Sequence, residues 1–265
     1  MLILLFAVNF IFSNYFIGNI VSIILLIMCA TVKKEQTQIL KQEMPKLSKC
    51  DNGLKNILFG ILFIGIYFSQ NLLSNIKIPT LGLAIALSFF TNIVVLVIGF
   101  LIFKVNFKRD LPCLKNHFRG YLSFIGPKLG ITYIIYVISA LVTSVISGSI
   151  SSVNQQMIEA LPLYYALPLA ILFAPIIEEL LFRGCLRRFI KNDILFIIIS
   201  AVTFGLLHTI YEANLFLAIV LCIPYAVLGG FFAYIYTKTN NIATSIMCHS
   251  FHNTIVMLLQ ILLFY

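Results

Sequence analysis

Long apolar runs separated by short polar segments extend along most of the chain. A run of about 20 apolar residues is long enough to cross the hydrocarbon core of a bilayer as a helix. Membrane-spanning barrels need alternating polarity instead, and these runs are uniformly apolar. We therefore predict an all-α, polytopic transmembrane helical bundle with about eight spans. The predicted spans are 17–32, 54–73, 81–103, 121–147, 164–190, 194–210, 213–235 and 241–264.

The composition argues against a separate soluble domain. The 265 residues are 61% hydrophobic and 10% charged, whereas soluble domains carry roughly 25% charged residues. The longest polar segment, 33–56, is too short and too polar to bury a core. The N-terminus lacks the features of a cleaved signal peptide, so we expect 17–32 to be retained as a span. We predict one integrated membrane domain, with N-terminal helices in 1–160 and the chemistry-bearing helices in 161–265.

The net charge of +9 is concentrated in alternate loops. Basic residues cluster in 33–56, 104–120 and 182–193, while the intervening loops carry almost none. This alternation follows the positive-inside rule, so the basic loops are predicted to face the cytoplasm. The charge is thereby accounted for by the lipid bilayer, and we expect no nucleic-acid partner. Together with short loops and compact size, this pattern predicts an integral protein of a bacterial plasma membrane.

Two adjacent carboxylates, Glu178 and Glu179, lie inside the fifth predicted span. An ionised group there costs about 2.5–3.5 kcal/mol even on insertion scales, so it is usually paired, hydrated or functional. Glu179 and Arg183 are four residues apart on one helix face, in the favourable order for an ion pair. Glu178 points about 100° away and lacks that partner. We expect Glu179 and Arg183 to give structural support and Glu178 to carry chemistry; a purely structural pair of carboxylates sharing one arginine is the competing interpretation.

Two histidines in other apolar segments are candidates to act with Glu178. His208 lies in the sixth predicted span, and His249 shares a helix face with Asn253 in the eighth. Glu178 and His208 each lie 15 residues from the turn at Asp193. On neighbouring antiparallel helices both would sit roughly 22 Å from that turn. The spacing therefore predicts Glu178 and His208 at the same depth, with a looser match for His249.

Three other residues carry weaker signals. Pro175 precedes Glu178 by three residues, and it either kinks the helix beside the carboxylate or is simply tolerated, as proline often is in membrane helices. His252 could share the face of His249, and Glu212 follows His208 by four residues in a predicted external turn. For His252 and Glu212 we favour structural roles.

The candidate residues form three ordered motifs: Glu178-Glu179-x-x-x-Arg183, Phe204-x-x-x-His208 and His249-x-x-x-Asn253. In this order and on membrane helices, they resemble the signature of the CPBP intramembrane protease family, which includes the type 2 CAAX prenyl protease and the Abi-type proteins. The resemblance covers roughly residues 163–255. Each motif is weak alone, and all three together are specific.

The resemblance implies a membrane-embedded endopeptidase. By matching position, Glu178 and His208 would activate a water, while His249 and Asn253 would bind that water or stabilise the oxyanion. The resemblance leaves metal dependence open. Zinc would be held by Glu178, His208 and His249, but Asn253 is a poor zinc ligand and the His-Glu-x-x-His motif is absent. A metal-free glutamate mechanism fits the sequence equally well.

Two other classes of function compete with a protease. A proton-coupled transporter would use Glu178 and His208 as a relay, but transporters often carry internal repeats and none is evident here. A non-catalytic immunity or scaffold protein is the third class, and the intact motifs weigh against it. For a protease, the expected partner is a peptide or protein substrate in the membrane, such as a peptide pheromone, a bacteriocin precursor or a leader peptide.

Overall fold

The computed structural model describes residues 54–73, 80–149 and 151–264. The first predicted span, 17–32, lies outside this part of the chain. The described residues are helical throughout, with short connections and no strand. The elements are α3 (Leu54–Leu73), α4 (Leu81–Ile102), α5 (Lys104–Asn116), α6 (Phe118–Ser147), α7 (Val153–Glu159), α8 (Leu163–Pro168), η1 (Leu169–Phe173), α9 (Ala174–Glu179), η2 (Leu180–Cys185), α10 (Leu186–Phe189), α11 (Asp193–His208), α12 (Leu215–Thr239) and α13 (Ile242–Phe264).

The predicted all-α membrane bundle is confirmed, and the predicted number of spans is corrected. Each of the seven predicted spans within the described ranges is helical, with α8 to α10 forming one continuous rod. Five helices there are long and apolar enough to cross a bilayer, fewer than the seven of the eight predicted spans that fall in these ranges. The difference arises because α11 has only 16 residues and the apolar part of α3 is 58–69. Sixteen helical residues extend about 24 Å, less than the roughly 30 Å hydrocarbon core.

Asparagine side chains define the ends of the two helices that follow the site-bearing rod. The side chain of Asn192 accepts a hydrogen bond from the Leu195 amide and starts α11. Asn214 does the same for α12 through Leu217. At the other end of α12, Asn240 adopts the left-handed conformation, with φ of 48°. These caps satisfy amides that the first helical turn leaves free, and Asn240 permits the sharp reversal into α13.

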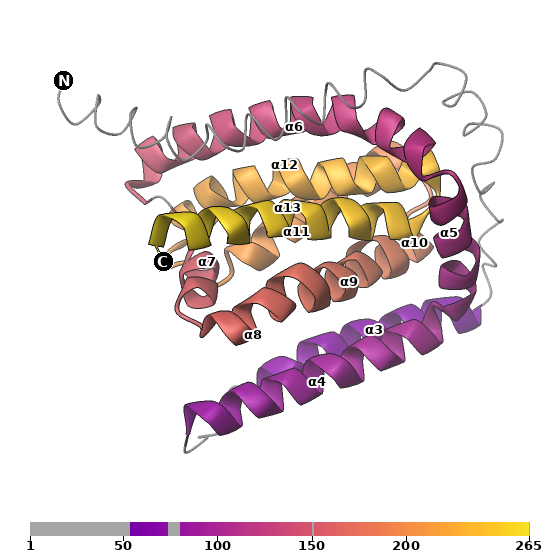
Figure 1. Ribbon diagram of the computed structural model, residues 1–265, viewed down its shortest axis with the longest axis horizontal. Coiled ribbons are helices and arrows are strands. Elements are labelled where there is room, and N and C mark those ends of the chain that lie inside the picture. Colours follow the sequence, from indigo (N-terminus) through magenta and orange to yellow (C-terminus); the bar gives the residue numbers. More distant parts are fainter. Residues whose placement is uncertain (1–53, 74–79, 150, 265) are drawn as a thin grey trace.

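The long helices run along a common direction, and α5 crosses them at one end (Figure 1). We call this the basic end, because it holds α5, α10 and the turn between α12 and α13. The basic segments 104–120 and 182–193 therefore meet at one end of the bundle, as the charge pattern requires, whereas α7 lies at the opposite end (Figure 1). The segment 104–120 was expected to be a loop, and it is instead mostly helical. The cytoplasmic orientation of the basic end stays a prediction.

Glycines bring α11 and α12 into close contact. A Cβ atom on Gly205 would lie 2.7 Å from the carbonyl oxygen of Cys222, and one on Gly229 would lie 2.7 Å from the Cβ of Phe204. Small residues allow such close approach between membrane helices. The short α11 is thereby held against α12 at the level where the motif residue His208 ends the helix.

Candidate active site

The rod that carries the two glutamates contains two widened turns. In η1 the Ala174 amide bonds to the Leu169 carbonyl, and in η2 the Leu186 amide bonds to the Leu181 carbonyl, so both turns have π-helical spacing. Between them, α9 carries Pro175, Glu178 and Glu179. Proline lacks an amide donor and clashes with the preceding turn, which the wide turn η1 accommodates. Such π-helical turns are frequent at functional sites, and here they set how the two carboxylates face their neighbours.

Glu179 is the centre of a buried hydrogen-bond network. Its Oε1 lies 3.0 Å from Nη1 of Arg183 and 2.9 Å from Nδ1 of His249, and its Oε2 accepts a bond from the Ser245 hydroxyl. The carboxylate and the guanidinium are fully buried. The contact between Glu179 and Arg183 was predicted from their spacing and is present. A buried charge needs this degree of pairing and hydrogen bonding to be tolerated.

Two partners in this network escaped the sequence analysis. Ser245 lies one turn before His249 on α13 and bonds both to Glu179 and to the carbonyl of Phe232, at 3.2 Å from the latter. The carbonyl oxygen of Gly229 on α12 accepts a hydrogen bond from Nη2 of Arg183. A lone serine in an apolar helix and a backbone carbonyl give no distinctive sequence signal. Only the four-residue spacing of Ser245 and His249 hinted at a shared face.

Glu178 and His208 meet on the other side of α9. Oε2 of Glu178 and Nε2 of His208 are 3.8 Å apart, which confirms that the two side chains lie at the same depth. This separation is longer than a direct hydrogen bond. Oε2 of Glu178 is buried and has no hydrogen-bond partner among the described residues. The structure thus presents a carboxyl oxygen and a ring nitrogen at a separation that a shared third group could bridge.

The His208 ring is held on both faces and at one edge. Its Nδ1 lies 2.9 Å from the carbonyl oxygen of Phe204. Because a carbonyl oxygen can only accept a hydrogen bond, Nδ1 carries the proton in the neutral ring, and Nε2 is the acceptor that faces Glu178. The ring lies against Phe204 and stacks on Tyr225, with ring centroids 4.4 and 4.8 Å apart. The Tyr225 hydroxyl is 2.8 Å from that of Ser152, which caps α7. Tyr225 and Ser152 are further positioning residues that sequence reasoning missed.

His249 and Asn253 were expected to face Glu178 and His208, and their hydrogen bonds instead go to other groups of the glutamate-bearing rod. Nδ1 of His249 bonds to Glu179 rather than approaching Glu178. The ring still lies near the Phe204 side chain, at a centroid distance of 5.5 Å, and Phe204 also contacts His208. The Asn253 amide donates to the carbonyl of Ala170 in η1, at 2.8 Å. Both motif residues of α13 therefore fasten this helix to the glutamate-bearing rod, while their remaining polar groups are uncommitted.

The two weaker candidates have structural partners. Nδ1 of His252 lies 3.0 Å from the Tyr133 hydroxyl on α6, and Oε1 of Glu212 accepts the Val153 amide at the start of α7, at 2.8 Å. The first contact fixes α13 against α6. The second satisfies a free amide at a helix start. Both contacts fit the structural roles favoured from the sequence.

The described residues do not assemble a metal-binding group. No three histidine, cysteine, aspartate or glutamate side chains in these ranges are grouped so that they could hold a metal ion. The set expected for zinc, Glu178, His208 and His249, is not grouped in this way. Nδ1 of His249 bonds to Glu179, and its Nε2 is left available. We derive no chemical step through a metal.

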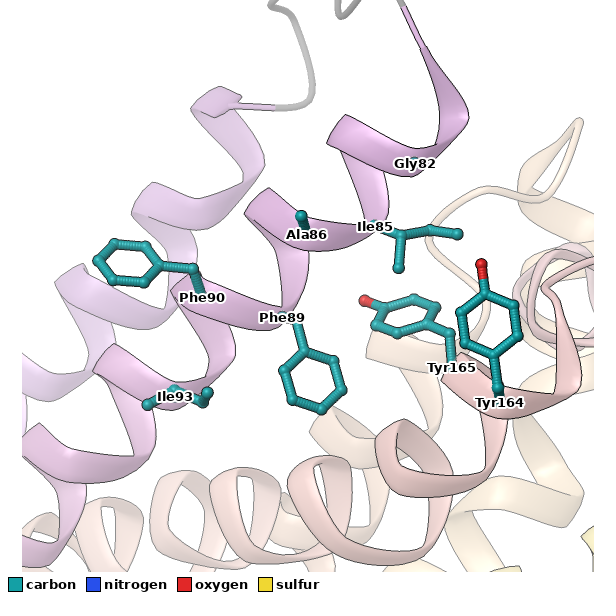
Figure 2. Close-up of a pocket in the computed structure, with 8 residues that line it drawn as sticks. All are labelled: Gly82, Ile85, Ala86, Phe89, Phe90, Ile93, Tyr164 and Tyr165. Carbon is teal, nitrogen blue, oxygen red and sulfur yellow. The ribbon is translucent and has the colours of Figure 1, made fainter.

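A cavity of about 470 Å³ opens between α4 and α8 (Figure 2). Aromatic side chains dominate its lining, with Phe89 and Phe90 from α4 and Tyr164 and Tyr165 from α8 (Figure 2). The hydroxyls of Tyr165 and Ser88 bond across the two helices. None of the motif residues lines this cavity, so it is separate from the candidate active site.

Fold and site together define a helical membrane protein with a polar centre built from ordered glutamate, histidine and arginine motifs. A family model described as type II CAAX prenyl endopeptidase Rce1-like matches residues 160–255, the part that holds all these motifs. UPF0177 protein YxdF of Lactococcus lactis subsp. lactis (strain IL1403) is 30% identical in an alignment of 158 residues that covers 57% of this chain and 84% of that protein. The chain belongs to the CPBP family, with an Rce1-like membrane core. No solved structure matches the chain significantly.

Proposed function

We propose that this protein is an intramembrane endopeptidase that hydrolyses peptide bonds of membrane-associated peptides or proteins with a water activated by Glu178 and His208. The single observation that carries the proposal is the geometry of this pair. Two acceptor atoms lie 3.8 Å apart, and the Glu178 oxygen has no partner in the described structure. A water with two hydrogen bonds of ordinary length spans that separation.

The proposed reaction uses Glu178 as general base. The bridging water donates one hydrogen to Glu178 and the other to Nε2 of His208, which leaves an oxygen lone pair free to attack the substrate carbonyl. On attack, Glu178 takes the proton and a tetrahedral oxyanion forms. Collapse of this intermediate breaks the carbon–nitrogen bond, and Glu178 delivers its proton to the departing amine. The carboxylate is thereby restored, and one water is consumed for each bond cleaved.

His249 and Asn253 are proposed to stabilise the oxyanion. Glu179 holds His249 through Nδ1 and fixes the orientation of the ring. A protonated Nε2 of that ring is a hydrogen-bond donor. The Asn253 amide donates one of its two hydrogens to the Ala170 carbonyl, and the second hydrogen remains available as a donor. Donors of this kind, fixed in advance, stabilise a developing negative charge without reorganisation.

The proposed substrate is a peptide or protein segment in a bacterial plasma membrane, and the basic loops are proposed to face the cytoplasm. The membrane helices and the Rce1-like match support a membrane-embedded substrate.

The decisive experiment compares membrane peptides from cells that produce the wild-type protein, Glu178→Gln or Glu159→Gln. Glu159 lies on α7, where its carboxylate contacts only Gln155 among the described hydrogen bonds, so it is a matched control for the loss of one charge. Loss of general-base catalysis lowers turnover by on the order of 10²–10⁴-fold. We expect product peptides with wild type and Glu159→Gln only. Normal product levels from well-folded Glu178→Gln would refute the proposal.

Metal dependence is a separate test on purified, active protein. Activity that survives complete removal of metal supports the metal-free mechanism. Activity lost to a chelator and restored by zinc would support a rearranged site, in which Glu178, His208 and His249 are the ligands proposed from the sequence.

A further inference from the structure

The helix α5 has the placement of an interfacial helix. It joins the ends of α4 and α6 and runs across the direction of the long helices at the basic end (Figure 1). One face is buried in the protein through Phe107 and Asp110. A helix that crosses the ends of membrane-spanning helices is placed to lie along the membrane surface, where amphipathic helices contact both headgroups and the upper acyl chains.

The outward face of α5 combines lysines with exposed apolar side chains. Lys104, Lys108, Leu111 and Lys115 follow one another at intervals of four, three and four residues, so they form a single stripe. All four are exposed, and Leu111 is 50% accessible. Beside the stripe, Val105 is 80% accessible. None of the three lysines has an ion pair or hydrogen bond with another described residue.

This combination favours a lipid over the alternatives. Water solvates lysine side chains well but gains nothing from contact with exposed leucine and valine. A free phosphate ion would bind to the lysines alone. A phospholipid offers an anionic headgroup to the lysines and acyl chains to Leu111 and Val105. We propose that the outer face of α5 binds anionic phospholipid headgroups of the leaflet at the basic end.

The inner face of the same helix is bonded to the start of α13. Asp110 is fully buried, and its Oδ2 accepts the Ile242 amide at 2.8 Å. Its backbone carbonyl accepts the side chain of Asn241 at 3.0 Å, and Arg109 donates to the Asn240 carbonyl at 2.9 Å. Burial raises the pKa of the Asp110 carboxyl, while the bonds from Arg109 and Ile242 act in the opposite direction.

These hydrogen bonds between α5 and the start of α13 couple lipid binding on α5 to the interior of the bundle. Asp110 caps the helix that carries Ser245 and His249, and these residues lie within its first two turns. Lipid that holds α5 against the membrane surface therefore also holds the first turn of α13. The proposal does not depend on the protease assignment, because it concerns binding and helix protection only.

The absence of tryptophan from the chain allows a direct test. Leu111→Trp places a single fluorophore in the centre of the lysine stripe, and Val145→Trp places one at an exposed position near the opposite end of α6. The full-length protein is reconstituted in phosphatidylcholine with a small fraction of brominated phosphatidylglycerol or brominated phosphatidylcholine. We expect the fluorophore at 111 to be quenched preferentially by the brominated phosphatidylglycerol, and the one at 145 to show no preference.

Charge variants then separate a local site from a general charge effect. Each lysine near an anionic surface strengthens binding about fivefold, so three lysines predict a preference on the order of 100-fold at low salt. Lys104→Gln, Lys108→Gln and Lys115→Gln together should abolish the preference. The matched control, Lys33→Gln with Lys34→Gln and Lys41→Gln, removes the same charge from another basic segment and should retain it. Equal quenching by both lipids, no quenching by either, or equal loss in both charge variants would overturn the proposal.

Hydrogen exchange at the Ile242 amide tests the link to α13. In bilayers that contain phosphatidylglycerol we expect slower exchange of this amide than in pure phosphatidylcholine, and no difference in the α5 triple variant. Unchanged exchange on adding phosphatidylglycerol, despite selective quenching, would overturn the proposed stabilisation of α13.

Discussion

Glu179 and Glu178 are neighbours in the chain, yet the two sides of α9 that they occupy are built differently. Glu179 faces α13 and has partners on both oxygens: Arg183, His249 and Ser245. Glu178 faces His208 across 3.8 Å, and one of its oxygens has no described partner. The same side-chain chemistry is thus fully satisfied on one side and left unsatisfied on the other.

The difference indicates how one helix can serve stability and chemistry together. A buried charge that is paired and hydrogen-bonded is held rigidly, but it has no capacity left for a reaction. A buried oxygen without a partner is costly to keep, and it is ready to bind a water or substrate group. We interpret the Glu179 side as the support that keeps the Glu178 side in place.

The largest loss of stability on the Glu179 side should come from Arg183→Ala. Removing one member of a buried ion pair leaves an uncompensated charge and costs about 3–5 kcal/mol. The free energy of unfolding, measured by SDS titration in mixed micelles with circular dichroism, should fall by that amount. Glu179→Gln combined with Arg183→Leu should cost less than the sum of the two single changes. An unaltered Arg183→Ala protein would show that the network does not support the fold.

A smaller loss is expected from Ser245→Ala. This change leaves Oε2 of Glu179 without its hydroxyl donor, and a buried group left unsatisfied costs about 1–3 kcal/mol. The same SDS titration measures the loss. Ser250→Ala, on the same helix but outside the network, is the control and should be nearly neutral. Equal losses of stability from the two changes would show that the Ser245 hydroxyl does not stabilise the network around Glu179.

Tyr225→Phe should have a smaller effect again, on the Glu178 side. The ring that stacks on His208 is kept, and only the hydroxyl contact with Ser152 is lost, which costs about 0.5–1.5 kcal/mol. Nitrogen-15 spectra of labelled histidine should still show His208 protonated at Nδ1. Tyr225→Leu removes the stacked ring and should mix the two tautomers. Identical spectra for Phe and Leu at this position would exclude a positioning role for the ring.

The smallest effect on stability is expected for Glu178→Gln, even though this change should abolish turnover. It changes a partly buried carboxyl group whose buried Oε2 makes no described hydrogen bond, so the unfolding free energy should not decrease. The comparison is sharpest beside Glu179→Gln, which should be clearly destabilised. A large loss of stability in Glu178→Gln would mean that both glutamates are structural.

Local spacing along the chain was sufficient for several features. Seven helices were predicted within a few residues of their observed bounds, because uniformly apolar runs of this length have no other stable state in a bilayer. The contact between Glu179 and Arg183 follows from helical periodicity alone. The meeting of Glu178 and His208 followed from equal distances to one turn between antiparallel helices.

Other features were decided only when the helices packed together. The rotation of α13 brings His249 to Glu179 instead of Glu178, and the same rotation recruits Ser245. Close contact of α11 and α12, which Gly205 permits, places Tyr225 on His208. Such contacts depend on how helices rotate and cross, and no periodicity within one segment specifies this.

The sequence by itself determined the class of protein, the order of the motifs and the residues that we propose carry the chemistry. The tertiary structure decided which glutamate is satisfied and which is left open. The physical reason is that hydropathy and i, i+4 spacing are properties of single helices. The surroundings of Glu178 and Glu179 instead depend on His208 from α11 and on Ser245 and His249 from α13, which meet the two glutamates only in the assembled bundle.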